Sequence, residues 1–181
     1  MKHILSILIL TLASVSVMTA QTTFPGLNAE TKKQLTASKR SVAFALPTWL
    51  PQGFTLTQVH SVVGPKVKLE DKQLVIVYSR EVANGKLQRF AFEAGFDGIG
   101  DLMYEGPRTL TTPIGKVHLY YQPKDEDGKK IMDFAMTEWF DIRGTAFHYI
   151  DRYGTEEEGG DRLTMISLAD TEKILKSLKR Y

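Results

Sequence analysis

The sequence predicts an α+β fold: a mainly antiparallel β-sheet with a C-terminal amphipathic helix packed on one face and a short N-terminal helix. From residue 41 onwards, apolar side chains recur at the two-residue period of β-strands. Turn signals separate these runs and no strand–helix–strand pattern interrupts them, which favours antiparallel pairing. The last segment, 167–180, returns to helical spacing.

Composition sets the outer limits. The chain has 181 residues, of which 43% are hydrophobic and 24% charged, with a formal net charge of +2. These values are ordinary for a globular protein and exclude collagenous, disordered and multi-pass membrane chains. The sequence contains no cysteine, so disulfides, thiolate metal sites and cysteine nucleophiles are excluded as well.

Residues 1–20 have the layout of a secretory signal peptide. Lys2 precedes an apolar run over residues 4–12, and small and polar residues follow. The run is too short for a spanning helix, which needs about 20 apolar residues. Cleavage after Ala20 fits best, and cleavage after Ser16 is the alternative. We therefore expect an exported protein, periplasmic or extracellular, with no stable membrane anchor after cleavage.

Residues 21–40 are expected to form a flexible lead-in and a short helix. Asn28 is a suitable N-cap for a helix over 29–40, in which Leu35 is the only large apolar residue. Such a polar helix belongs at the periphery. Residues 41–181 then form a single α+β domain.

Proline and glycine residues predict the turns that separate the strands. Pro47 and Pro51 predict a turn, because proline removes a ladder donor. Asn84-Gly85 is the strongest hairpin signal in the chain, since both residues tolerate positive φ. Strands are expected over residues 42–46, 54–63, 74–78, 87–94, 108–112, 116–122, 131–140, 146–153 and 163–166.

The C-terminal helix is predicted from a cap and an apolar stripe. Ser167 is the expected N-cap, with Asp170 three residues later as in a capping box. The stripe consists of Leu168, Ile174, Leu175 and Leu178. Basic residues near its end are expected to complement the helix dipole: Lys176, Lys179 and Arg180.

We predict no metal site and no cofactor. After the leader, the only histidines are His60, His118 and His148, each in a separate predicted strand. Asp125 and Asp127 resemble part of a calcium loop, but the spaced third aspartate and the distal glutamate are missing. A hairpin turn at Asp127 and the glycine after it explains these residues better.

No catalytic residue is predicted either, and we expect the protein not to be an enzyme. The chain lacks a Gly-x-Ser-x-Gly motif, and the glycines of 95–101 match no phosphate-binding loop. The near-zero charge gives no electrostatic reason to expect nucleic-acid binding. The strand aromatics are expected in the core. Their functional alternative is an apolar groove between the sheet and the closing helix.

One segment carries a family resemblance. Residues 46–54 read Leu-Pro-Thr-Trp-Leu-Pro-Gln-Gly-Phe. This is similar to the opening of a family of bacterial extracytoplasmic domains of unknown function. These domains are found in the outer parts of anti-sigma factors and resemble the C-terminal domain of periplasmic sigma-E regulators. The likeness extends over roughly residues 42–180. It continues in the apolar run 74–78, in Trp139, Gly144 and Tyr149, and in the helical segment 167–178.

The resemblance implies an exported, non-enzymatic binding or regulatory module of the bacterial cell envelope. An anti-sigma factor would also carry a sigma-binding segment and a membrane span, so this chain resembles the outer module alone. The leading hypothesis is therefore binding of an envelope protein or polypeptide, by strand addition at an exposed edge. A lipid or lipoprotein carrier is the alternative, and an unrecognised envelope hydrolase is the third. No ligand-binding residue is assigned from the sequence.

Overall fold

The computed structural model describes residues 23–96, 106–125, 127–131, 133–154 and 160–181. The expected leader and most of the glycine-rich segment 95–101 lie outside these ranges. The described chain contains two α-helices, α1 (Ala29–Ser38) and α2 (Leu168–Lys176). Two short 3₁₀ helices complete the helical elements of the described chain: η1 (Ala83–Gly85) lies between the strands at 73–81 and 87–95, and η2 (Gly160–Arg162) precedes α2.

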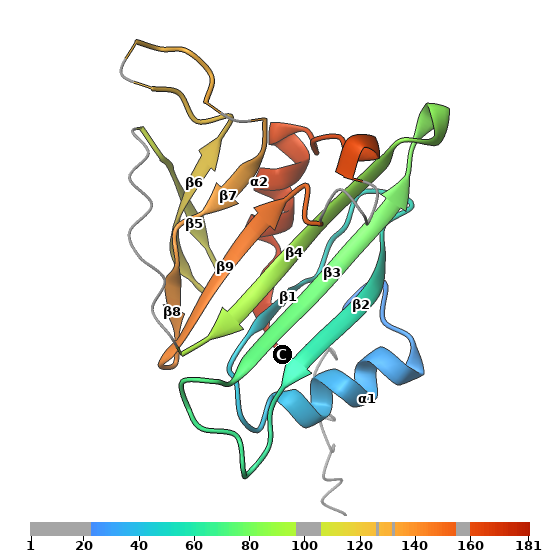
Figure 1. Cartoon of the computed structure of the whole chain (residues 1–181), viewed down its shortest axis with the longest axis vertical. Helices are drawn as coiled ribbons and strands as arrows, with labels where there is room; N and C mark the ends of the chain where they lie inside the picture. The colour runs from blue at the N-terminus through green and yellow to red at the C-terminus, as the bar shows by residue number, and fades with distance from the viewer. Residues whose placement is uncertain (1–22, 97–105, 126, 132, 155–159) are drawn as a thin grey trace, which may run out of the picture.

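Eight of the described strands form one antiparallel sheet, which confirms the α+β class (Figure 1). Its spatial order is β2 (Thr55–Val62), β3 (Gln73–Glu81), β4 (Leu87–Gly95), β9 (Thr145–Asp151), β7 (Ala135–Thr137), β6 (Gly115–Tyr121) and β5 (Arg108–Thr112). An eighth strand, β8 (Phe140–Ile142), pairs with β9 outside this path. Consecutive strands pair through hairpins over β2–β3–β4 and β5–β6–β7.

Several local predictions are confirmed. Asn28 caps α1 in a reciprocal capping box with Thr31, and Leu35 is fully buried. The turn between β3 and β4 contains Asn84 and Gly85 at φ 61° and 64°, which is the left-handed region that this pair was expected to adopt. The strand expected over 108–112 has these same bounds.

The chain end differs from the prediction. The helix stops at Lys176, and β10 (Leu178–Arg180) pairs with β1 (Ala45–Pro47) in a separate two-stranded sheet. Leu178 is buried, as expected, but from a strand. Lys179 and Arg180 therefore do not lie at the helix end. In a further helical turn the carbonyl oxygens of these last residues would have no intrahelical partner, whereas the antiparallel ladder pairs residues 178–180 with residues 45–47.

Three strand predictions need correction. The strand expected over 42–46 begins at Ala45 and includes Pro47. The strand expected over 131–140 is divided into β7 and β8, because the ladder shifts register along β9 around Trp139. The strand expected over 163–166 is reduced to an isolated bridge between Leu163 and Leu87.

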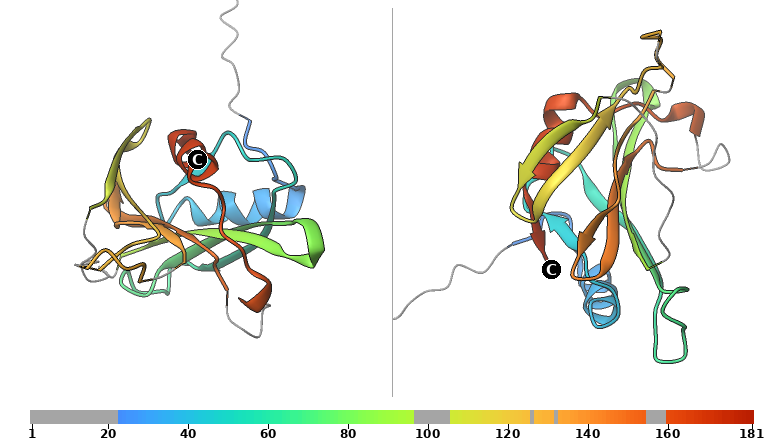
Figure 2. Two further views of the ribbon diagram at one scale, coloured as in Figure 1. Left: turned by 90° about the horizontal axis from the view of Figure 1, so that it is seen from above. Right: turned by 90° about the vertical axis from the view of Figure 1, so that its left-hand side faces the viewer.

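The sheet is curved, and both α-helices lie on its concave face (Figure 2). The largest buried rings project from the middle strands into this layer: Tyr78, Phe90, Phe92, Phe147 and Tyr149. They contact one another directly; the Phe90 and Tyr78 centroids, for example, are 5.0 Å apart. Ile174 and Leu175 of α2 are fully buried in the same cluster. The convex face, toward the viewer in Figure 1, is covered by neither α-helix.

Replacing Leu175 with alanine should test the packing of α2 on the sheet. Leu175 is fully buried, so Leu175→Ala should lower the free energy of unfolding by about 2–5 kcal/mol, measured by urea denaturation. Leu69→Ala is the matched control, because Leu69 is 56% exposed; its effect should stay within about 0.5 kcal/mol. Equal effects of the two substitutions would contradict this packing.

Candidate functional site

The convex face carries His60 and His148 on one row across the sheet. His60 lies opposite Val75, Val75 opposite Glu93, and Glu93 opposite His148. Farther along, the backbone N–H of Glu138 donates to the carbonyl oxygen of His118 at 3.0 Å. Cross-strand neighbours share a face, so residues assigned to separate strands from the sequence become parts of one surface.

His148 is held between a carboxylate and an indole ring. Its Nε2 lies 2.8 Å from Oε2 of Glu93, and the side chains of these two residues are 5% and 28% exposed. Trp139, from the register shift between β7 and β8, stacks on the imidazole with ring centroids 3.8 Å apart. His148 Nδ1 has no hydrogen-bond partner among the described residues. The stack therefore fixes both rings over the middle of the sheet.

A second histidine–glutamate pair joins His118 of β6 to Glu138, the residue after β7. Oε2 of Glu138 is 2.8 Å from Nδ1 of His118, and Oε1 accepts a hydrogen bond from the Tyr120 hydroxyl at 2.7 Å. Burial, followed by the hydrogen bond to Glu138 and its charge, raises the pKa of Tyr120 to about 12. Tyr120 therefore stays protonated and acts as a hydrogen-bond donor near neutral pH.

The described residues contain no group of three histidine, aspartate or glutamate side chains placed to hold a metal ion. Asp125, singled out in the sequence for its likeness to a calcium loop, instead closes a turn. Its carboxylate accepts a hydrogen bond from the backbone N–H of Lys129 at 2.8 Å, and the backbones of Lys124 and Lys130 form an isolated antiparallel β-bridge. This agrees with the hairpin that was expected there.

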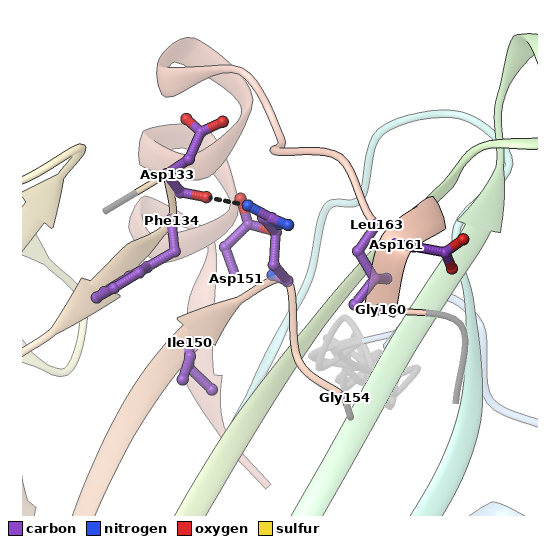
Figure 3. A pocket seen from close by; sticks show the side chains of 9 residues that line it. Asp133, Phe134, Ile150, Asp151, Gly154, Gly160, Asp161 and Leu163 are labelled. Atoms are coloured by element: carbon purple, nitrogen blue, oxygen red, sulfur yellow. Dashed lines mark hydrogen bonds between the residues drawn. The ribbon is translucent and has the colours of Figure 1, made fainter. Parts of the chain in front are cut away.

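The larger convex-face cavity, about 850 Å³, lies between the end of β9 and η2 (Figure 3). Its lining includes the charged residues Asp133, Asp151, Arg152 and Asp161 and the apolar residues Phe134, Ile150 and Leu163. Nη1 of Arg152 donates to the carbonyl oxygen of Asp133 at 2.9 Å, the contact drawn in Figure 3. Charged groups that line this cavity therefore already form hydrogen bonds within the chain.

Asp151 fastens the segment before α2 to the end of β9. Its Oδ2 accepts the backbone N–H of Ile166 at 2.9 Å, and its Oδ1 accepts that of Arg152 at 2.8 Å. Arg152 has a φ of 54°, in the left-handed region. Burial raises the pKa of Asp151 to about 7, with the two backbone hydrogen bonds acting in the opposite direction. The Asp151 carboxyl group therefore has a structural role, and its pKa is well above that of an ordinary aspartate.

A smaller cavity of about 250 Å³ opens at the other end of the convex face, beside the start of β3. Glu70 and Glu93 supply two carboxylates, and Phe96 and Trp139 supply two aromatic rings. It shares Glu93 and Trp139 with the His148 cluster. Sequence reasoning missed this site, because its residues come from three separate stretches of the chain, 70–75, 93–96 and Trp139, which only the folded sheet brings together.

No protein-family model, curated protein or solved structure matches the chain. The resemblance described from residues 46–54 onwards stays a prediction from the sequence. Within the part of the chain that the structure describes, no helix is both long and apolar enough to cross a membrane.

The titration of Asp151 should appear in the pH dependence of stability. Its pKa is about 7 in the folded chain and ordinarily 3.8, so between these values the folded state holds a proton that the unfolded state has lost. Stability from this group must then fall as pH rises from about 4 to about 7.

Urea denaturation of the wild type and Asp151→Asn across this range isolates the effect, because the other groups are common to both proteins. The wild-type free energy of unfolding minus that of the variant should decrease as pH rises. A constant or increasing difference would show that the pKa of Asp151 is not raised.

Proposed function

We propose that the protein is an exported, non-enzymatic binding module of the bacterial cell envelope that binds an extended polypeptide by strand addition to β2. One observation carries the proposal. The edge strand β2 pairs, among the described strands, with β3 alone, and its sequence Thr-Leu-Thr-Gln-Val-His-Ser-Val has no Lys, Arg, Asp, Glu or Pro. Edge strands are usually protected by such residues, so this one is chemically suited to pairing.

α1 packs against β2, but the backbone contacts and the irregular pairing that protect its edge lie at its start. The backbone N–H of Leu56 donates to the carbonyl oxygen of Gly26 at 3.3 Å, and the register shift lies between Leu56 and Gln58. From Gln58 onwards the ladder with β3 is regular. At its end Val62 is 51% exposed. Residues 58–62 therefore offer a regular edge to which main-chain hydrogen bonds of a partner can be added.

The opposite edge, β5, is a poorer candidate. α2 packs beside it, and Nε of Arg108 lies 3.3 Å from Oε1 of Glu172 on that helix. Placing a charged side chain at an edge strand disfavours strand addition. A helix packs against each edge strand, α1 against β2 and α2 against β5, so the difference that supports β2 as the binding edge is its lack of charged side chains.

The lipid-carrier alternative has less support. It needs space between the sheet and the closing helix, and buried aromatic rings occupy much of that layer, with Phe92 and Phe147 stacked at 5.3 Å. Export follows from the predicted leader over residues 1–20, which lies outside the described residues. A role in envelope stress sensing follows from the resemblance to anti-sigma outer domains.

Val62→Lys should block strand addition at β2. A lysine at this 51% exposed position places a hydrated charge on the edge without disturbing the core. Twelve-residue peptides selected from a random display library on the processed wild-type chain should bind Val62→Lys about tenfold more weakly in fluorescence-anisotropy titrations.

Ile131→Lys is the matched control, because Ile131 is 44% exposed and lies outside the described strands. It introduces the same charge and should leave the affinity unchanged. Equal affinity of the wild type and Val62→Lys for every selected peptide would refute binding at this edge, as would equal weakening by both substitutions.

A further inference from the structure

We propose that the 250 Å³ cavity beside β3 is a subsite for a lysine or arginine side chain of the polypeptide partner. This inference rests on the proposed function, in which β2 supplies the rest of the surface that binds the polypeptide. Small-molecule sites have volumes of about 300–1,000 Å³, so a cavity of this size suits a single side chain better than a larger ligand.

The charge of the cavity favours a cation. Glu70 and Glu93 both line it, and its described lining includes no lysine or arginine. Glu93 is positioned by His148 through Oε2, and its side chain is 28% exposed. A partly buried carboxylate held in place loses little further freedom when it binds a cation, so it attracts one more effectively than a mobile surface residue does.

The aromatic residues that line the cavity also favour a cation. Trp139 and Phe96 contribute rings, and the stack on His148 fixes the orientation of Trp139. Lysine and arginine are attracted to the faces of such rings. The protein already uses this interaction elsewhere: Nζ of Lys173 lies 3.9 Å from the centre of the Trp49 ring. Carboxylates and an indole together define a site for an organic cation.

The position of the cavity connects it to the edge. Its lining residues Gln73 and Val75 lie opposite Val62 and His60 of β2. Neighbouring strands are about 4.8 Å apart, so a strand added to β2 would lie about 9.6 Å from β3. Glu70 lies in the connection between β2 and β3. The basic side chain therefore has to come from the part of the partner that runs past the end of β2, beside this connection.

The test uses N-acetyl-arginine amide as the probe, with N-acetyl-citrulline amide as its uncharged counterpart of similar shape. In NMR titrations of the processed chain, the arginine probe should shift the indole N–H signal of Trp139 and leave that of Trp49 in place. The citrulline probe should shift neither. Trp49→Phe assigns the two signals.

Glu70→Gln and Glu93→Gln should each weaken binding of the arginine probe about three- to fivefold, because each removes one charge. Glu70 is exposed, so its substitution tests the site even if Glu93→Gln disturbs His148. Glu30→Gln, on exposed α1 surface, is the matched control and should change the affinity less than about twofold.

Equal shifts with both probes, or unchanged affinity in both pocket variants, would overturn the cation subsite. A single amino-acid derivative cannot add a strand, so that result would leave binding at β2 standing. Conversely, loss of the Val62→Lys effect on peptide binding, with the arginine result intact, would refute strand addition but not the pocket.

Discussion

Pairing of β10 with β1 determines which surfaces of this protein are available. It ties the chain end back to residues 45–47, while the Ser177 carbonyl oxygen accepts hydrogen bonds from both the backbone N–H and the hydroxyl of Thr48. These contacts hold α2 against the concave face, where Ile174 and Leu175 complete the aromatic core. The convex face and the β2 edge are consequently the surfaces to which the proposed function assigns binding.

The two cavities on the convex face differ in how their charges are used. At the end of β9, Asp151 and Arg152 are bound to backbone groups of the chain itself, so their main contribution is to hold the segment before α2. Beside β3, Glu70 and Glu93 share a cavity with two aromatic rings. The first arrangement stabilises the fold, whereas the second supplies unlike groups suited to one class of side chain.

The fold class was predictable because its signals are local. Asn84-Gly85 defines a hairpin from two residues, and Asn28 defines a helix start from its own side chain. The strand at Leu178 was missed because it depends on β1, more than a hundred residues earlier. The candidate site was not predictable, since Glu93, His148 and Trp139 meet only through register, and a sequence pattern does not specify register between distant strands.

The most direct test of the account is amide hydrogen exchange of the processed chain, measured by mass spectrometry with and without a selected peptide. Strand addition satisfies outward backbone groups of the edge, so the account predicts slower exchange in residues 58–62, with α1 and α2 unaffected. Slower exchange confined to α2 and β5, or no change along β2 at saturating peptide, would contradict it.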